Sequence, residues 1–220
     1  TGDMSMALVS GINHVAIDFK HTTAEDQGSY FPLAALRRAA SAGRIGGVAP
    51  RFHGVPTHRS QRVTRDEYAP EVLARCREDG VDAAVLVPNC PVCHQSLVLV
   101  ARHLEANGIP TVVMGCAKDI VESVGAPRFV FSDFPLGNAA GLPNDRKSQD
   151  LTLGLALDLL GEATAPRATA QSPLEWNGDP DWKRDYGNVE GLSDDAIAAL
   201  RADFDAQKAA GKAVQQPSGG

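Results

Sequence analysis

Two cysteines and a histidine lie close together in the stretch "VPNCPVCHQSLVLV", residues 87–100. Cys90, Cys93 and His94 form a Cys-x-x-Cys-His pattern at the point where an apolar run ends and a helical pattern begins. Four chemistries use such spacing: a redox dithiol, a zinc site, covalent haem attachment and an activated nucleophile. The neighbouring residues and elements decide between them.

Haem attachment and zinc binding fit the rest of the chain poorly. Haem attachment belongs to small, mostly helical exported domains, whereas this motif lies within alternating strand and helix patterns. Zinc takes four tetrahedral ligands, and no second Cys-x-x-Cys or His-x-x-x-His pattern supplies them. Cys116, after the next predicted strand, could add a third sulfur. A metal-binding or sensor protein using Cys90, Cys93 and Cys116 is therefore one open alternative, and two inert, buried thiols are another.

The predicted surroundings of Cys90 favour thiol chemistry. Pro91 pre-sets the backbone for a first helical turn, so Cys90 would face unpaired N–H groups and the positive end of the helix dipole. Both stabilise a thiolate. Cys93, one turn further on the same side, is placed to attack an adduct or mixed disulfide at Cys90. We predict Cys90 as the nucleophile and Cys93 as the resolving thiol.

Two histidines are candidate proton carriers for this pair. His94 follows Cys93 directly, and His53 follows a short, glycine-flanked strand pattern. Imidazole titrates near neutral pH, so either ring could deprotonate Cys90 or protonate a leaving group. The structural alternatives are a helix-surface position for His94 and a loop hydrogen bond for His53.

Strand and helix patterns alternate from about residue 45 to residue 162. This order predicts an α/β fold, a three-layer Rossmann-like domain with a mainly parallel sheet. We expect strands near residues 14–19, 45–55, 81–87, 109–116 and 127–133, and helices near 31–43, 64–80, 91–107, 118–125 and 145–163. Thr64 and Glu67 have the spacing of a capping box for the second helix, and Pro70 requires a late start or a kink there.

Ligands of parallel sheets bind beyond the carboxyl ends of the strands. Cys90, Cys116 and the segment "SDFPLGNAAG" follow predicted strands. We therefore predict substrate binding by Asn89, Cys116, Asp133 and Asn138. The structural alternative for Cys116, which its residue type favours, is a buried apolar filler.

The chain divides into two parts by composition. Residues 1–163 form the predicted α/β catalytic domain. Residues 164–220 are predicted to hold an irregular aromatic segment, with Trp176 and Trp182, and a C-terminal helix that serves packing or oligomerisation. We expect a homo-oligomer.

Charge and cysteine content exclude several protein classes. The net charge is -6 over 220 residues, and no basic stripe is present, so nucleic-acid binding is disfavoured. No apolar run reaches the roughly 20 residues that span a bilayer, and no secretory signal pattern is present. Four cysteines are too few for a disulfide scaffold. The sequence favours a cytoplasmic protein without membrane contact.

Three stretches resemble a known reductase family over about residues 31 to 160. They are "FPLAALRRAASAGRIGGVAPRFHG", "EVLARCREDGVDAAVLVPNCPVCHQSLVLVARHLEANGIPTVV" and "GAPRFVFSDFPLGNAAGLPND". They are similar to the selenocysteine-type subunits of D-proline reductase and, more distantly, of component B of glycine, sarcosine and betaine reductases. The family motif is selenocysteine-x-x-Cys-His-x-Ser at a helix start. Cys90 occupies the selenocysteine position, and Cys93, His94 and Ser96 match the rest, which adds Ser96 to the predicted substrate-binding residues.

The resemblance implies a reductive cleavage of a carbon–nitrogen bond. In that family a selenol attacks the carbon next to an amine captured by the pyruvoyl group of a partner subunit, the neighbouring cysteine resolves the product, and an external dithiol restores the pair. Here Cys90 replaces the selenocysteine and Pro91-Val92 replaces Gly-Thr between the two positions. No pyruvoyl-forming segment is present, so we expect no cofactor in this chain and a pyruvoyl group on a partner.

The sequence therefore predicts a thiol-dependent reductase with a Cys-x-x-Cys pair, acting on a small polar substrate with a dithiol as electron donor. The alternatives are a pyruvoyl-independent cysteine-pair enzyme that cleaves C–S or related bonds and the Cys/His metal-binding protein.

Overall fold

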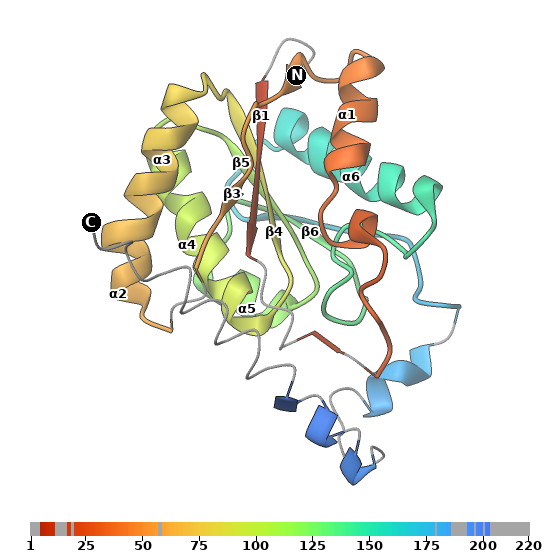
Figure 1. The fold of residues 1–220 in the computed structure, drawn as a ribbon. Helices are drawn as coiled ribbons and strands as arrows, with labels where there is room; N and C mark the ends of the chain where they lie inside the picture. The colour runs from red at the N-terminus through yellow and green to blue at the C-terminus, as the bar shows by residue number, and fades with distance from the viewer. Residues whose placement is uncertain are drawn as a thin grey trace, which may run out of the picture.

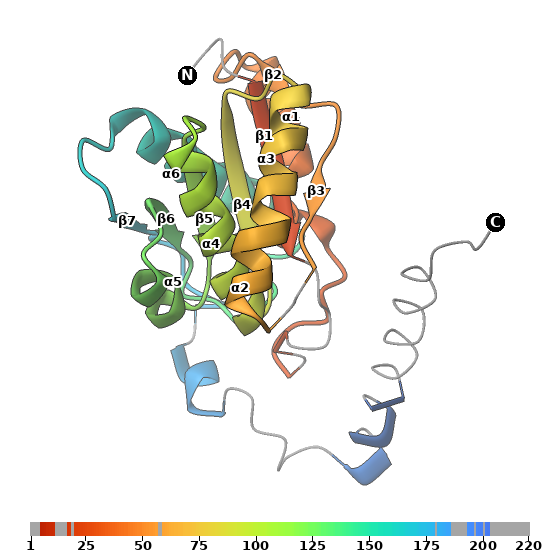
Figure 2. The same cartoon turned by 90° about the vertical axis from the view of Figure 1, so that its left-hand side faces the viewer.

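A computed structural model describes residues 5–11, 17–18, 20–56, 59–178, 180–185, 193–195, 197–199 and 201–202. In these residues a parallel sheet is covered by helices on both faces, as Figures 1 and 2 show. The predicted three-layer, Rossmann-like α/β fold is confirmed.

The described sheet has seven strands in the order β2-β1-β4-β5-β6-β7, with β3 also paired to β1. All six strand pairs are parallel. The strands are β1 (Ser5–Gly11), β2 (Gly47–Val48), β3 (His53–Gly54), β4 (Ala83–Pro88), β5 (Thr111–Gly115), β6 (Arg128–Phe131) and β7 (Ala168–Gln171). Every residue of β4 and β5 is buried, as expected of strands covered on both faces.

Two apolar cores separate the sheet from its helices. One face carries α3 (Ala69–Glu78), α4 (Pro91–Ala106) and α5 (Lys118–Val124), and the other carries α1 (Leu33–Ser41) and α6 (Arg146–Glu162). The predicted helices near residues 31–43, 91–107, 118–125 and 145–163 are confirmed. Because all strands are parallel, their carboxyl ends share one edge, where α4 and α5 begin.

The first strand differs from the sequence prediction. β1 is Ser5–Gly11, and its apolar side chains from Met6 to Val9 are almost fully buried between β4 and the outer strands. The strand expected at residues 14–19 lies largely outside the described residues, and residues 17 and 18 are not in a strand. Alternating hydrophobicity favoured residues 14–19 as the first strand, whereas β1 is a continuous apolar run that does not alternate.

The helix expected at residues 64–80 begins earlier than predicted. Ser60 is the N-cap, and its hydroxyl accepts a hydrogen bond from Val63 N at 3.3 Å. The chain then passes through α2 (Gln61–Val63) and one π-helical turn, Thr64–Tyr68, before α3. The capping role predicted for Thr64 is wrong, because its backbone is already helical. The wider π turn lies directly before Pro70, which has no N–H to continue a regular α-helical ladder.

The sheet continues beyond residue 163. β7 lies in the segment predicted to be irregular and pairs with β6 along four residues. A short 3-10 helix, Pro180–Asp185, follows, here called the C-terminal turn. Of the predicted C-terminal helix, residues 194–195, 197–199 and 201–202 are helical, and the others lie outside the described residues. None of the described helices is long and apolar enough to cross a membrane.

Candidate functional site

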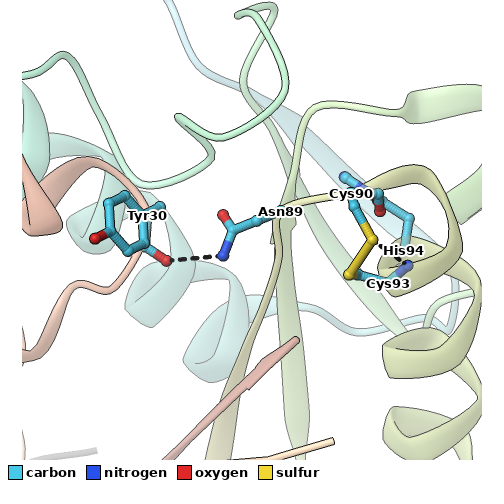
Figure 3. The surroundings of a disulfide bond; sticks show 5 residues. All are labelled: Tyr30, Asn89, Cys90, Cys93 and His94. Atoms are coloured by element: carbon cyan, nitrogen blue, oxygen red, sulfur yellow. Dashed lines mark hydrogen bonds between the residues drawn. A yellow bond between two sulfur atoms is a disulfide. The ribbon is translucent and has the colours of Figure 1, made fainter. Parts of the chain in front are cut away.

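Cys90 and Cys93 form a disulfide at the start of α4 (Figure 3). Their Cα atoms are 5.0 Å apart, within the usual range for a disulfide. Cys90 is the N-cap of α4, and its Sγ accepts a hydrogen bond from Cys93 N at 3.2 Å. The sulfur of Cys90 therefore lies where the first turn of the helix directs its unpaired N–H groups.

The local sequence explains this geometry. β4 ends at Pro88, and Pro91 is the first residue of α4, a position that tolerates its missing N–H. A residue before proline avoids the helical region, and Cys90 is extended, with φ -126° and ψ 162°. An extended residue followed by a helix is the conformation of an N-cap.

Both sulfur-bearing residues are buried in this oxidised state. Cys90 and Cys93 are each 1% exposed. A cavity begins at the adjacent residue, Pro91, and neither cysteine of the pair lines it. The described residues thus enclose the disulfide, and a reactant can reach the sulfurs only if the turn opens.

His94 is fully buried next to the pair, which excludes the helix-surface position. Its Nδ1 lies 2.7 Å from Cys90 O, and its Nε2 accepts hydrogen bonds from Cys116 N at 3.0 Å and Ala117 N at 3.2 Å. A carbonyl only accepts and a backbone N–H only donates, so Nδ1 carries the proton and Nε2 is bare. Burial lowers the pKa of His94 to about 4, so the ring is neutral at neutral pH.

His53 lies in a different environment. It belongs to β3 at the edge of the sheet, and its Nε2 is 3.7 Å from Asp79 Oδ2, just beyond the C-terminal end of α3. Burial lowers the pKa of His53, and the nearby Arg51 acts in the same direction. The contacts of His53 connect it with Asp79 and not with the cysteine pair, so the structure does not bring together all four predicted catalytic residues.

A cavity of about 420 Å³ opens at the carboxyl edge of the sheet. Its walls come from the start of α4, the loop and first turn after β5, the loop after β6 and the C-terminal turn. The lining residues are Pro91, Cys116, Ala117, Asp119, Ile120, Phe134, Leu136, Trp182 and Lys183. The cavity therefore combines apolar walls with one carboxylate and one ammonium group.

The predicted substrate-binding residues are divided around this cavity. Cys116 lines it, and burial raises the pKa of its thiol to about 12, so it is a neutral thiol. Asp133 forms an ion pair with the cavity residue Lys183. Asn138 is buried and donates through Nδ2 to Pro135 O at 3.2 Å, which holds the loop after β6.

The other two predicted substrate-binding residues lie outside the cavity wall. Ser96 is buried within α4. Asn89 donates to Tyr30 O at 3.4 Å, and Figure 3 shows its side chain extending toward Tyr30, away from the disulfide. Asn89 Oδ1 is buried without a hydrogen-bond partner among the described residues.

Asp119, Trp182 and Lys183 also line the cavity, although their sequence pattern did not predict it. Trp182 contacts the ring of His21, with centroids 6.0 Å apart, and Lys183 pairs with Asp133. These contacts hold the C-terminal turn across the end of the sheet. The aromatic composition of this segment was a signal of packing, but nothing in its spacing indicated which surface it covers. Trp176 is buried against Phe134 of the same chain.

Among the described residues, no group of three or more His, Cys, Asp or Glu side chains is arranged to hold a metal ion. The alternative that Cys90, Cys93 and Cys116 bind a metal therefore gains no support from their geometry.

Comparison with curated sequences finds a relative of this chain. No protein-family model and no solved structure matches the chain. The chain is 29% identical over 184 residues to the protein named D-proline reductase subunit gamma from Acetoanaerobium sticklandii, and the match covers 80% of this chain and 76% of that protein. This agrees with the resemblance carried by the cysteine motif and its flanking stretches. The chain is thus similar to D-proline reductase subunit gamma over most of its length.

Proposed function

We propose that this chain is the thiol-bearing subunit of a reductase and cleaves a carbon–nitrogen bond of a small polar substrate through Cys90 and Cys93. The observation that carries the proposal is the disulfide at the N-cap of α4, at the carboxyl edge of a parallel sheet, in a D-proline reductase-like chain. Parallel sheets bind ligands at this edge.

The proposed cycle starts from the reduced pair. The Cys90 thiolate attacks the substrate carbon that bears the amine, so a C–S bond forms as the C–N bond breaks, and the amine leaves with its electron pair and takes up a proton. Cys93 then attacks the sulfur of Cys90. The S–S bond forms, the C–S bond breaks, and the carbon keeps the electron pair and takes up a proton. The substrate gains two electrons, and an external dithiol restores them to the chain by reducing the disulfide.

The helix start supports the role of Cys90 as the nucleophile. In the reduced chain the N–H of Cys93 and the helix dipole favour the thiolate, so we expect Cys90 to titrate below the ordinary cysteine value of about 8.5. The structure corresponds to the oxidised end of the cycle, in which the sulfurs are enclosed.

The cavity is the proposed substrate site. Lys183 could pair with a carboxylate, and Asp119 with an amine, so the walls suit a small molecule that carries both charges. Opening of the turn at Pro91 would join this space to the reduced sulfurs.

A partner subunit is also part of the proposal, because the relative is named as one subunit of a reductase. If a pyruvoyl group takes part, the partner supplies it, and its carbonyl would make the amine a better leaving group. Lys183 and Asp119 would hold the substrate for it from this side of the interface.

Comparing Cys90→Ala with Cys93→Ala tests the cycle. The reduced variants are incubated with D-proline, with and without the pyruvoyl-bearing subunit, and intact mass is recorded. Cys93→Ala should accumulate a covalent adduct at Cys90, because the resolving thiol is missing, whereas Cys90→Ala should form none. Cys76→Ala is the matched control, since Cys76 lies on the buried face of α3 and burial raises the pKa of its thiol to about 11.

An adduct in Cys90→Ala, or none in any variant when the partner is present, would contradict the proposal. An adduct that forms equally well without the partner would still support a mechanism through the Cys90–Cys93 dithiol, and it would favour the pyruvoyl-independent alternative.

A further inference from the structure

We propose that His94 is a positioning residue that couples the cysteine turn to the wall of the cavity. Its ring holds the N-cap residue of α4 from one nitrogen and the loop after β5 from the other. The inference rests on the proposed function for the use of the pair, but its test measures the thiol–disulfide equilibrium of this chain alone.

The Nδ1 side of the ring fixes the position of Cys90. The carbonyl oxygen of Cys90 accepts the first helical hydrogen bond from His94 N at 3.0 Å and a second one from the Nδ1–H of the same residue at 2.7 Å. Two donors at one carbonyl fix the orientation of the peptide between Cys90 and Pro91. The sulfur is thereby kept at the helix N-terminus, where it accepts from Cys93 N.

The Nε2 side of the ring fixes the cavity wall. Cys116 and Ala117 are consecutive lining residues, and both of their N–H groups point to Nε2. Ala117 is also the N-cap residue of α5, which carries Asp119 into the cavity wall. A shift of the His94 ring would therefore move the loop and the start of α5.

Gly115 provides the space for this contact. A Cβ at Gly115 would lie 2.8 Å from His94 Nε2 and 2.9 Å from His94 Cδ2, closer than real Cβ atoms approach other atoms. The φ angle of Gly115 is not positive, so the backbone does not require glycine there. Glycine at position 115 is therefore explained by the close approach of the His94 imidazole.

The proposed coupling affects the thiol–disulfide exchange between the Cys90–Cys93 pair and an external dithiol. An external dithiol gives two electrons and two protons to the Cys90–Cys93 disulfide, which becomes two thiols, while the donor becomes a disulfide. His94 exchanges no electrons in this step. After reduction Cys90 releases its proton to become a thiolate. His94 holds Cys90 at the N-cap, which favours the reduced form because the hydrogen bond from Cys93 N, already present in the disulfide, is stronger when it is donated to the charged thiolate sulfur.

Two variants separate the two contacts of the ring. The amide of His94→Asn lies near the position of Nδ1 and can still donate to Cys90 O, but it leaves Cys116 N and Ala117 N without an acceptor. The amide of His94→Gln lies near Nε2 and can still accept from the loop, but it loses the side-chain bond to Cys90 O.

Two readouts report on the two sides. The chain is equilibrated in mixtures of oxidised and reduced dithiothreitol for long enough that transient opening admits the reagent to the disulfide. It is then quenched in acid and alkylated after unfolding, so the measured fraction of reduced chains, and hence the reduction equilibrium constant, does not depend on the exposure of the sulfurs in the folded chain. The second readout is the alkylation rate of native Cys116 by iodoacetamide, located by peptide mass.

His94→Gln should lower the reduction equilibrium constant about tenfold, about 30 mV for a two-electron couple, and leave the alkylation rate of Cys116 within about twofold of wild type. His94→Asn should leave the reduction equilibrium constant near the wild-type value and speed alkylation of Cys116 about tenfold. Gly115→Ala, which displaces the ring, should change both readouts, whereas Gly47→Ala, in a strand with nothing within 4 Å of the added carbon, should change neither.

A purely structural histidine would give a different result: both amide variants would change both readouts together, in proportion to their loss of stability, and this would overturn the proposal. If the variants do not fold, ¹⁵N spectra of wild-type His94 decide. The proposal requires a protonated Nδ1 and a bare Nε2 in both redox states, and a proton on Nε2 in either state would refute it.

Discussion

At the scale of the residue, the buried imidazole makes stability depend on pH. The pKa of His94 is about 4 in the folded chain, below the value of 6.5 in the unfolded chain. Between these values the unfolded chain binds more protons, so the free energy of unfolding falls as pH falls from about 6.5 to about 4. The loss attributable to His94 is on the order of 3 kcal/mol, and the lowered pKa of His53 acts in the same direction.

Urea denaturation at a series of pH values between 4 and 7 measures this dependence. His94→Gln should remove most of the slope in that window. His103→Gln, further along the same helix and partly exposed, should leave the slope unchanged. A slope that persists in His94→Gln would show that other groups cause it.

The residue types around Cys90 predicted the position of the cysteine pair, but they did not predict that the neighbouring His94 is buried. Pro91 after Cys90 and an apolar run before it were enough to place Cys90 at a helix N-terminus. The burial of His94 depends on Gly115, 21 residues later, coming close to the ring. Sequence spacing within one helix contains no information on such a contact.

At the scale of the element, the C-terminal turn forms one wall of the cavity through Trp182 and Lys183. Lys183→Ala should leave the free energy of unfolding within about 1 kcal/mol of wild type, because the ion pair with Asp133 is partly exposed. If the cavity is the substrate site proposed above, the variant should bind a small zwitterionic ligand, tested with D-proline, about tenfold more weakly, since one of the two opposite charges at the cavity is lost. Tryptophan fluorescence during titration with D-proline gives the dissociation constant.

Arg184→Ala is the matched control for this prediction. Arg184 is the next residue, and its ion pair with Asp181 lies on the exposed surface of the same turn. Equal affinity in both variants, or an unchanged affinity in Lys183→Ala, would exclude Lys183 from ligand binding.

Elements with strong periodicity were predicted well, and elements shaped by their neighbours were not. The bounds of α4 and α6 follow from apolar spacing and capping residues. The helix that leads to α3 starts at Ser60, and its π turn accommodates Pro70, so a local capping-box pattern at Thr64 was misleading. The strands β2 and β3 are two residues each and exist because β1 lies beside them.

At the scale of the whole molecule, β7 ties the C-terminal segment to the sheet. A chain ending at residue 163 would leave the edge of β6 unpaired and expose Phe134 to solvent where Trp176 now covers it. We expect that chain to aggregate or to melt at a lower temperature. A chain ending at residue 178 keeps β7 and Trp176 and should melt cooperatively, near the wild-type temperature.

Size-exclusion chromatography and thermal unfolding by circular dichroism compare the two truncated chains. Equal melting temperatures would support a domain that is complete at residue 163. A difference in favour of the longer chain would place the boundary after β7.

The overall topology was predictable because strand and helix patterns alternate, but the two ends of the chain were not. β1 and β7 are strands near the two ends of the chain, and they pair with β4 and β6, which lie far from them in the sequence. The cavity depends on the same long-range arrangement, because its walls come from four segments that only the folded sheet brings together.

The loop after β5 also affects which electron carriers can bind at the carboxyl edge of this sheet. In many parallel sheets the backbone amides at the start of a helix after a strand bind the phosphates of a nucleotide. Here the amides of Cys116 and Ala117 are already occupied by an imidazole of the same chain. A pyrophosphate could bind at that turn only by displacing the ring, so we expect reducing equivalents to arrive through sulfur exchange and not from a dinucleotide held at this position.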